Sequence, residues 1–200
     1  MRSATVAALV LALGACTNPA PPVPAVQPAP TAARPAAAPV IVPAAATSGA
    51  LRLTSPAFAE GQPVPKTSTC DAGDRSPALA WSGAPPGTRS FALILDDPDA
   101  PAGTWVHWIV FGIPADRTGL PEGAAMDGPL RGGANSWGKA TYGGPCPPPG
   151  APHRYVFRLF ALDVTPDLAA GASRPALEAA MRGHILAEAT MMGRYGRQKK

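Results

Sequence analysis

Proline limits what this chain can fold into more than any other residue, because it occurs 27 times in 200 residues. A proline inside a helix removes a hydrogen bond and clashes with the preceding turn. Prolines interrupt nearly every window long enough for a coiled coil or a long helical bundle, so the sequence excludes both. No apolar run approaches the about 20 residues that a membrane-spanning helix needs. The hydrophobic content of 46% is nevertheless normal for a globular protein, so a folded domain is expected in part of the chain.

Residues 17–49 are the segment most enriched in proline, with nine Pro and eleven Ala and almost no charge. They show no apolar periodicity and cannot bury enough surface to offset the entropy lost on ordering. Proline also biases such a segment towards extended polyproline geometry. We therefore expect residues 16–49 to be a disordered linker, followed by one domain over residues 50–196 and a basic tail over 197–200.

The first fifteen residues have the features of a secretory signal peptide: one Arg near the start, a short apolar stretch and small residues at its end. The next feature, Leu13-Gly14-Ala15-Cys16, resembles the bacterial lipobox, in which the cysteine is acylated and becomes the mature N-terminus. An ordinary signal peptide with a chance cysteine is the alternative. The lipobox predicts a lipid anchor on Cys16 in the bacterial cell envelope. Thr17 in place of Asp after the cysteine favours the periplasmic side of the outer membrane.

The net charge of +4 and the pI near 9.3 come from the two ends of the chain. Six of the 17 basic residues lie before residue 35 or after residue 193. Residues 50–193 carry 13 acidic and 11 basic side chains, a net charge of −2. Nucleic-acid binding requires basic residues clustered on the domain itself. We therefore expect no nucleic-acid partner.

Two cysteines remain after Cys16, at positions 70 and 146. In an exported domain, such a pair can form a disulfide. A bridge between them would stabilise the fold by about 4 kcal/mol on the chain-entropy model. Two independent buried thiols are the alternative, since sequence does not show whether the two backbones approach each other.

Short apolar runs separated by Pro and Gly clusters predict an antiparallel β architecture. We expect strands over residues 51–54, 79–81, 91–95, 105–111 and 155–162. One helix is predicted from Ser173 to Met192, with Ser173 as the N-cap, Gly193 as the C-terminal stop and apolar residues at helical spacing. In this interpretation the histidine at 184 is a structural residue of that helix, and the methionines at 191 and 192 pack in the core or at its edge.

Two clusters carry residue types suited to chemistry. The first is Asp96-Asp-Pro-Asp-Ala-Pro101, followed by Trp105-Val-His-Trp108. The second is Tyr142-Gly-Gly-Pro-Cys-Pro-Pro-Pro-Gly150, which runs into His153-Arg-Tyr155. Strand alternation places His153 and Tyr155 on one sheet face. Histidine and tyrosine donors on one face can hold an anion, and a nearby carboxylate can select the tautomer of an imidazole.

A purely structural interpretation competes with this hypothesis for each cluster taken alone. Asp97 and Asp99 could be turn formers, and His107 could be a buried strand histidine. Together, however, the clusters resemble the phosphatidylethanolamine-binding protein family, also called the Raf kinase inhibitor protein family, in its bacterial branch. The matching stretches follow family order over roughly residues 51–196; they are Ser76-Pro77 with Trp81, 97–101, 105–108, 142–148 with Gly150, 153–155, 181–187 and 193–195.

The resemblance implies a mainly β fold, a sandwich of two antiparallel sheets with peripheral helices and a C-terminal helix. It also implies a small anion-binding pocket lined by Asp97, Asp99, Pro101, His107, His153 and Tyr155. Gly144 and Pro145 would shape the loop of this pocket.

The function expected from the resemblance is binding of phosphate, phosphoethanolamine or a similar phospholipid head group. Inhibition of a protease or another enzyme through protein contact is the alternative, with an unknown protein partner. The sequence contains no nucleophile elbow, P-loop or H-E-x-x-H zinc motif. We therefore expect a protein that is not an enzyme and holds no metal or cofactor.

Overall fold

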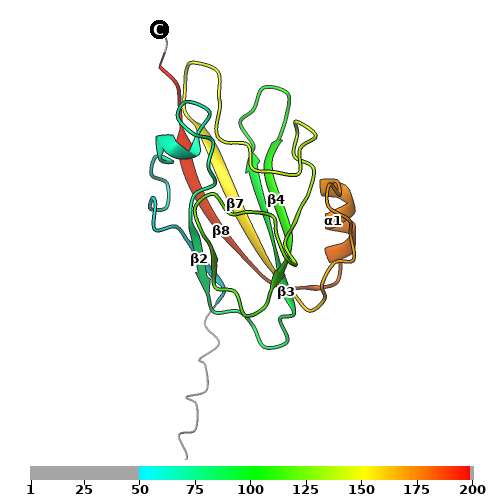
Figure 1. The fold of residues 1–200 in the computed structure, drawn as a ribbon. Coiled ribbons are helices and arrows are strands. Elements are labelled where there is room, and N and C mark those ends of the chain that lie inside the picture. Colours follow the sequence, from blue (N-terminus) through cyan, green and yellow to red (C-terminus); the bar gives the residue numbers. More distant parts are fainter. Residues whose placement is uncertain (1–49, 199–200) are drawn as a thin grey trace, which may run out of the picture. The chain divides into compact units, whose positions relative to one another are not determined.

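The computed structural model describes residues 50–198, which form two antiparallel sheets packed face to face (Figure 1). The small sheet has the order β1-β2-β5 and the large sheet the order β6-β4-β3-β7-β8. The strand bounds are β1 Arg52–Thr54, β2 Leu79–Ser82, β3 Ser90–Asp97, β4 Trp105–Pro114, β5 Gly119–Leu120, β6 Arg131–Gly132, β7 His153–Leu162 and β8 Ile185–Tyr195. The predicted mainly β sandwich of two antiparallel sheets is confirmed.

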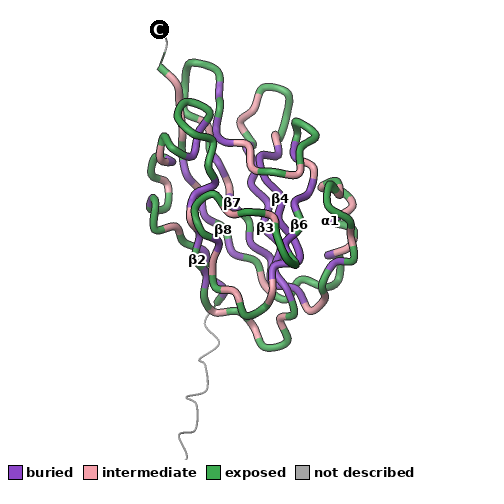
Figure 2. Tube along the Cα trace, viewed as in Figure 1, coloured by how far each residue is buried: buried purple, intermediate pink, exposed green. Residues whose placement is uncertain are grey.

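Strand β3 lies in the middle of the large sheet, and all eight of its residues are buried. Leu93 and Leu95 face the core between the two sheets, together with Trp81 of the small sheet. Ala92 and Ile94 point to the other face, where a second core is closed by the helix α1 (Arg174–Met181). Figure 2 shows this buried central layer between exposed loops. Because both faces are covered, the strand reads in sequence as a continuous apolar run.

Strand β4 pairs with β3 in a register that shifts near the end of β3. Leu95 pairs with Trp108 and Asp96 with Val106, so His107 has no partner residue on β3. His107 is therefore the extra residue of a β-bulge. A bulge changes the direction of a side chain and often lies beside a functional site.

The predicted helix from Ser173 to Met192 is correct only in its first half. Ser173 caps α1 by accepting a hydrogen bond from the Ala176 amide (3.3 Å), but the helix ends at Met181. Gly183 then adopts a φ of +80°, which suits glycine and ends the helix. From Ile185 onward the chain forms strand β8, which pairs along the whole of β7.

Tertiary pairing explains this error, because ladder hydrogen bonds to β7 outweigh the helix propensity of an Ala- and Met-rich segment. Ala189 and Met191 alternate into the core between the sheets. Methionine 191 is thus a core residue, as expected, but in a strand. His184 lies in the turn before β8, exposed, with its Nδ1 2.8 Å from Asp163 Oδ1, rather than inside a helix.

The remaining regular element is the short 3-10 helix η1 (Lys66–Ser68). Between residues 50 and 198 no helix is long and apolar enough to cross a bilayer. The predicted signal peptide (1–15), the lipobox Cys16, the linker (16–49) and the last two residues of the tail lie outside the described residues.

Candidate functional site

Three strand ends meet at one end of the large sheet. In the register of the sheet, Asp97 at the end of β3 is opposite Trp105 at the start of β4, and Asp96 is opposite Val156 near the start of β7. The loops that follow β3 and precede β7 therefore lie at the same end, the upper end in Figure 1. This arrangement brings together the two sequence clusters, which are about fifty residues apart in the chain.

The Asp97 carboxylate and the His153 imidazole form the centre of this end. His153 Nδ1 lies 2.7 Å from Asp97 Oδ2, and the other oxygen, Oδ1, accepts a hydrogen bond from the Asp99 amide (2.9 Å). Both side chains are largely buried, with 12% of His153 and 5% of Asp97 exposed. Because a carboxylate only accepts, His153 carries a proton on Nδ1 and leaves Nε2 for a ligand.

His107 lies beside this pair, and its orientation is set from the other side of the loop. His107 Nδ1 is 2.7 Å from the Gly143 carbonyl oxygen, which can only accept, so Nδ1 carries the proton and the neutral ring leaves a lone pair on Nε2. Burial lowers the pKa of His107 below its ordinary value, although the hydrogen bond to Gly143 and the Asp97 charge oppose this. The lowered pKa favours the neutral ring, which can accept a hydrogen bond at Nε2.

Tyr155 packs edge-on against His107, with 5.2 Å between ring centroids. Its hydroxyl is fully buried and has no hydrogen-bond partner among the described residues. Burial, followed by the nearby Asp97 charge, raises the pKa of Tyr155 far above the ordinary value, so the phenol keeps its proton. The Asp97 carboxylate is the acceptor nearest in chemistry to this donor, and Tyr155 itself does not line the cavity described next.

These side chains lie at a cavity of about 310 Å³. Of the predicted site residues, Asp97, Pro101, His107 and His153 line it. The other lining residues are Ala100, Ala102, Trp105, Trp137, Cys146, Pro147 and Pro148. Tyr155 lies directly behind His107. A cavity that combines apolar walls with a few convergent polar groups is typical of a small-ligand site.

Asp99, Gly144 and Pro145 do not line this cavity. Asp99 turns outward to Arg154, whose Nη2 lies 2.6 Å from Asp99 Oδ1, and this pairing lowers the pKa of Asp99 to about 2. Its structural role is to hold the loop after β3 against β7. The alternation expected for β7 is observed, since Arg154 is exposed on the face opposite Tyr155.

Gly144 and Pro145 instead hold their loop against the segment that follows η1. The Gly144 amide donates to Asp74 Oδ1, and a Cβ at Gly144 would lie 2.6 Å from the Ser68 carbonyl oxygen. The Pro145 carbonyl accepts from the Cys70 amide (3.2 Å). Glycine is therefore required at 144 by close backbone approach.

A disulfide joins this loop to the segment after η1. Cys70 and Cys146 are bonded, with 5.4 Å between their Cα atoms. The Tyr142 hydroxyl adds a hydrogen bond to the Ser68 carbonyl (2.7 Å). Because Cys146 and the two prolines after it line the cavity, this link holds one wall of the site in place.

Sequence reasoning missed Trp137, which is 46% exposed and lies at the mouth of the cavity. Its ring makes edge contacts with His107 (5.1 Å) and with Trp105 (5.3 Å). A Cβ at Gly143 would lie 2.6 Å from the Trp137 ring, so a larger residue at 143 would displace that ring. The available signal was a lone tryptophan within a polar Asn-Ser-Trp-Gly turn, a context that gives no apolar reason for the residue.

Between residues 50 and 198, no three His, Cys, Asp or Glu side chains come close enough together to hold a metal ion. The arrangement offers two imidazoles with available Nε2 atoms and one unpartnered phenol. Such a set can donate hydrogen bonds to the oxygens of a small anion once the imidazoles are protonated.

Comparison with known proteins agrees with this fold and these motifs. The profile of the family described as phosphatidylethanolamine-binding protein matches residues 54–196. A UPF0098 protein of Methanothermobacter thermautotrophicus is 47% identical over 152 residues, covering 74% of this chain and 99% of the relative. A UPF0098 protein of Mycobacterium bovis is 40% identical over 172 residues, covering 84% of this chain and 81% of the relative.

Two crystal structures share the fold. The first is a phosphatidylethanolamine-binding protein homologue of Chlamydia trachomatis, with a TM-score of 0.71, 40% identity and coverage of 74% of this chain and 99% of that one. The second is Escherichia coli YbcL, described as a member of the mammalian family, with a TM-score of 0.70, 32% identity and coverage of 75% and 100%. On its motifs, its fold and these relatives, the chain belongs to the phosphatidylethanolamine-binding protein family.

Proposed function

We propose that this protein is a binding protein whose cavity at His107 and His153 holds a small anion, either phosphate or the phosphate of a phospholipid head group. The observation that carries the proposal is that two largely buried imidazoles line a single cavity, with the buried Tyr155 phenol packed against His107. The imidazoles are oriented by separate acceptors, Asp97 and Gly143, so both present the same ring nitrogen. Preorganised donors of this kind lose little entropy when a ligand binds.

The site should favour an anion that either carries a proton or causes His107 to take one up on binding. Neutral His107 offers a lone pair, which suits the P–O–H group of monoanionic phosphate. Protonated His107 offers a donor to the dianion. Affinity for phosphate should therefore increase as the pH falls.

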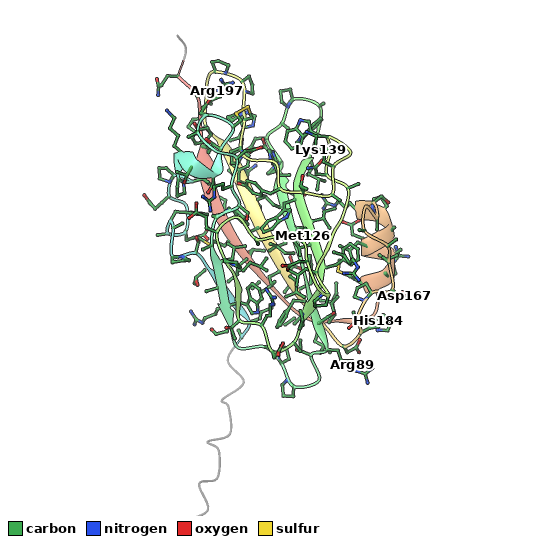
Figure 3. The ribbon with its side chains drawn as sticks, viewed as in Figure 1. Arg89, Met126, Lys139, Asp167, His184 and Arg197 are labelled. Carbon is green, nitrogen blue, oxygen red and sulfur yellow. A yellow bond between two sulfur atoms is a disulfide. The ribbon has the colours of Figure 1, made fainter. Side chains whose placement is uncertain are left out.

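Nuclear magnetic resonance titration of the full chain tests the proposal. With labelled histidines, phosphate and phosphoethanolamine should produce saturable shifts at His107 and His153. His184 serves as an internal control, since it is exposed, bonded to Asp163 and located at the opposite end of the molecule from Lys139 (Figure 3). Substitution His153→Gln should abolish the response, whereas His184→Gln should leave it unchanged. Absence of any shift at millimolar phosphate would refute an anion site.

The proposal includes binding without turnover. Phosphoethanolamine incubated with the full chain should show an unchanged phosphorus spectrum after hours at 25 °C. Release of inorganic phosphate that depends on His107 would instead make the protein a hydrolase. If the histidines do not respond to anions, inhibition of a protease by protein contact is the function to test next, as saturable inhibition with a defined stoichiometry.

We also propose that Cys16 is acylated and anchors the domain in the bacterial cell envelope, on the periplasmic side of the outer membrane. The support is the lipobox-like Leu13-Gly14-Ala15-Cys16 and the Pro- and Ala-rich residues 17–49. In polyproline geometry, at about 3.1 Å per residue, such a spacer reaches on the order of 100 Å. Labelling of expressing bacteria with an alkynyl fatty acid should mark the wild-type chain and a Cys146→Ser variant. Label on a Cys16→Ser variant would contradict the anchor.

A further inference from the structure

A second cavity of about 330 Å³ lies next to the one at His107 and His153. Trp137 and Cys146 line both cavities and form the boundary between them. We propose that this second cavity binds the organic part of the ligand, and that this part is a neutral, hydroxyl-rich group. The preferred ligand is then a phosphate ester of a sugar or a similar polyol. This inference rests on the proposed anion site.

One turn supplies most of the second cavity, and a buried amide organises it. Asn135, 5% exposed, accepts hydrogen bonds at Oδ1 from the backbone amides of Trp137 and Lys139 (both 3.0 Å). Its Nδ2 donates to the Thr141 carbonyl (2.9 Å). The side chains of residues 137, 139 and 141 are thereby carried on a fixed backbone, a precondition for a specific site.

The polar side chains of this cavity still have hydrogen-bonding capacity. Among residues 50–198, the Lys139 ammonium and the Thr141 hydroxyl make no hydrogen bond or ion pair, although both residues line the cavity. Asp74 uses one oxygen for the Gly144 amide, and its second oxygen remains available. The cavity thus offers donors from lysine, acceptors from aspartate and a hydroxyl that can do either.

This combination indicates the charge of the group that fits. Lys139 and Asp74 have opposite charges in one small cavity, so a second phosphate would meet Asp74 and an ammonium group would meet Lys139. A neutral group rich in hydroxyls can donate to the carboxylate and accept from the ammonium at the same time. The exposed Trp137 ring supplies an apolar surface for the C–H bonds of such a group. Figure 3 shows Lys139 at the outer surface of the same end of the molecule as the site.

Isothermal titration calorimetry with the full chain compares three ligands: inorganic phosphate, glucose 1-phosphate and phosphoethanolamine. Two or three additional hydrogen bonds should make glucose 1-phosphate bind about tenfold more tightly than phosphate. The double variant Lys139→Gln/Thr141→Val should reduce this preference to about twofold while phosphate binds as before. The matched control Lys66→Gln/Thr67→Val changes two exposed residues of η1 that line neither cavity and should keep the full preference.

The outcomes separate this inference from the proposed function. If phosphate itself fails to bind, the anion site is refuted and the inference falls with it. If phosphate binds but glucose 1-phosphate binds no more tightly, or if the preference survives the double variant, only the inference is refuted. Preference for phosphoethanolamine over glucose 1-phosphate also refutes it.

Backbone amide chemical shifts show where the organic part of the ligand contacts the protein. Backbone amide shifts at Lys139 and Thr141 should respond to glucose 1-phosphate and not to inorganic phosphate, and a common response to both would refute a separate subsite. Sedimentation of a Cys16→Ser chain, which lacks the proposed site of acylation, with vesicles of phosphatidylinositol in phosphatidylcholine identifies the source of the ester. Binding that glucose 1-phosphate competes away assigns a lipid head group, and absence of vesicle binding assigns a free phosphate ester; both support the inference.

Discussion

Asp96 and Asp97 are neighbours at the end of β3, equally buried, and face opposite sides of the large sheet. Asp96 points to the α1 side, where Arg174 Nη1 lies 2.7 Å and Arg158 Nε 3.8 Å from its oxygens. Asp97 points to the other side, where its partners are the His153 ring and the Asp99 amide. Two adjacent carboxylates of equal burial thus have different environments.

Asp96 and Asp97 differ in the side chains that they contact. Arginine is always charged and occupies Asp96 permanently, so this pair serves the packing of α1 on the sheet. Histidine has a second ring nitrogen that its contact with Asp97 leaves available, so the Asp97–His153 pair can also contact a ligand. In this protein, the buried carboxylate that belongs to the candidate site is the one whose partner, His153, has a second ring nitrogen available and lines a cavity.

The largest expected effect is the loss of stability when the Asp96–Arg174 ion pair is broken. Substitution Arg174→Met leaves the Asp96 carboxylate buried with only the more distant Arg158, and should lower the free energy of unfolding by about 3 kcal/mol at pH 7. Burial already raises the pKa of Asp96, and loss of Arg174 raises it further. The raised pKa means that protonation favours the folded state, so the loss should shrink as the pH falls from 7 towards 5. Urea unfolding at both pH values measures this.

A control separates the buried contact from the exposed one. Glu178→Gln removes the other partner of Arg174, at 2.7 Å on the helix surface, and should cost less than about 0.5 kcal/mol. Both variants should bind phosphate within about twofold of the wild type. A loss in Arg174→Met that is no larger than in Glu178→Gln would contradict a structural role for Asp96.

The second effect is on affinity. Substitution Asp97→Asn removes the charged acceptor that orients the His153 ring and should weaken phosphate binding about tenfold. Because the amide oxygen can still accept from the Asp99 amide, we expect the fold to persist, with an unfolding free energy reduced by about 1 kcal/mol. Calorimetric titration and urea unfolding on the same sample measure both quantities. Unchanged affinity would place Asp97 with Asp96 as a structural residue.

The third effect concerns pH and His107. Burial lowers the pKa of His107, so the unfolded chain binds a proton more readily than the folded one. Stability should therefore fall as the pH drops below the ordinary value of about 6.5, and phosphate should offset this loss because it favours protonated His107. A His107→Gln variant should lose several-fold of the gain in affinity between pH 7 and pH 5.5. Parallel pH profiles for variant and wild type would exclude His107 from the proton coupling.

The smallest effect tests the exposed neighbour of the site. Arg154 holds the pKa of Asp99 at about 2, and Arg154→Gln should return it towards 3.8, as measured by the carboxyl carbon shift. The pair is largely exposed, so the free energy of unfolding should change very little. Phosphate affinity should change by less than about twofold, since Asp99 does not line the cavity. A larger loss of affinity would restore Asp99 to the site.

The sequence was most informative where local pattern and tertiary environment agree. Strands β3 and β4 contain long continuous runs of apolar residues, and β7 is rich in aromatic and aliphatic residues, which both the hydrophobic effect and strand propensity favour. The motif residues at 97, 107 and 153 were recognisable because polar and titratable side chains beside such runs have no packing reason. The pattern was misleading after Gly183, where Ala and Met are compatible with helix and only the ladder to β7 makes a strand.

By itself, the sequence determined the β-sandwich class, the family and the residues around which the site is built, because these depend on apolar periodicity and on local motifs. Only the tertiary structure decided that Asp99 turns away to Arg154, that Tyr155 lies behind His107, and that Trp137 lines the cavity. The physical reason is that sheet register, the bulge at His107 and the meeting of distant loops are set by long-range pairing. A chain position alone does not contain that information.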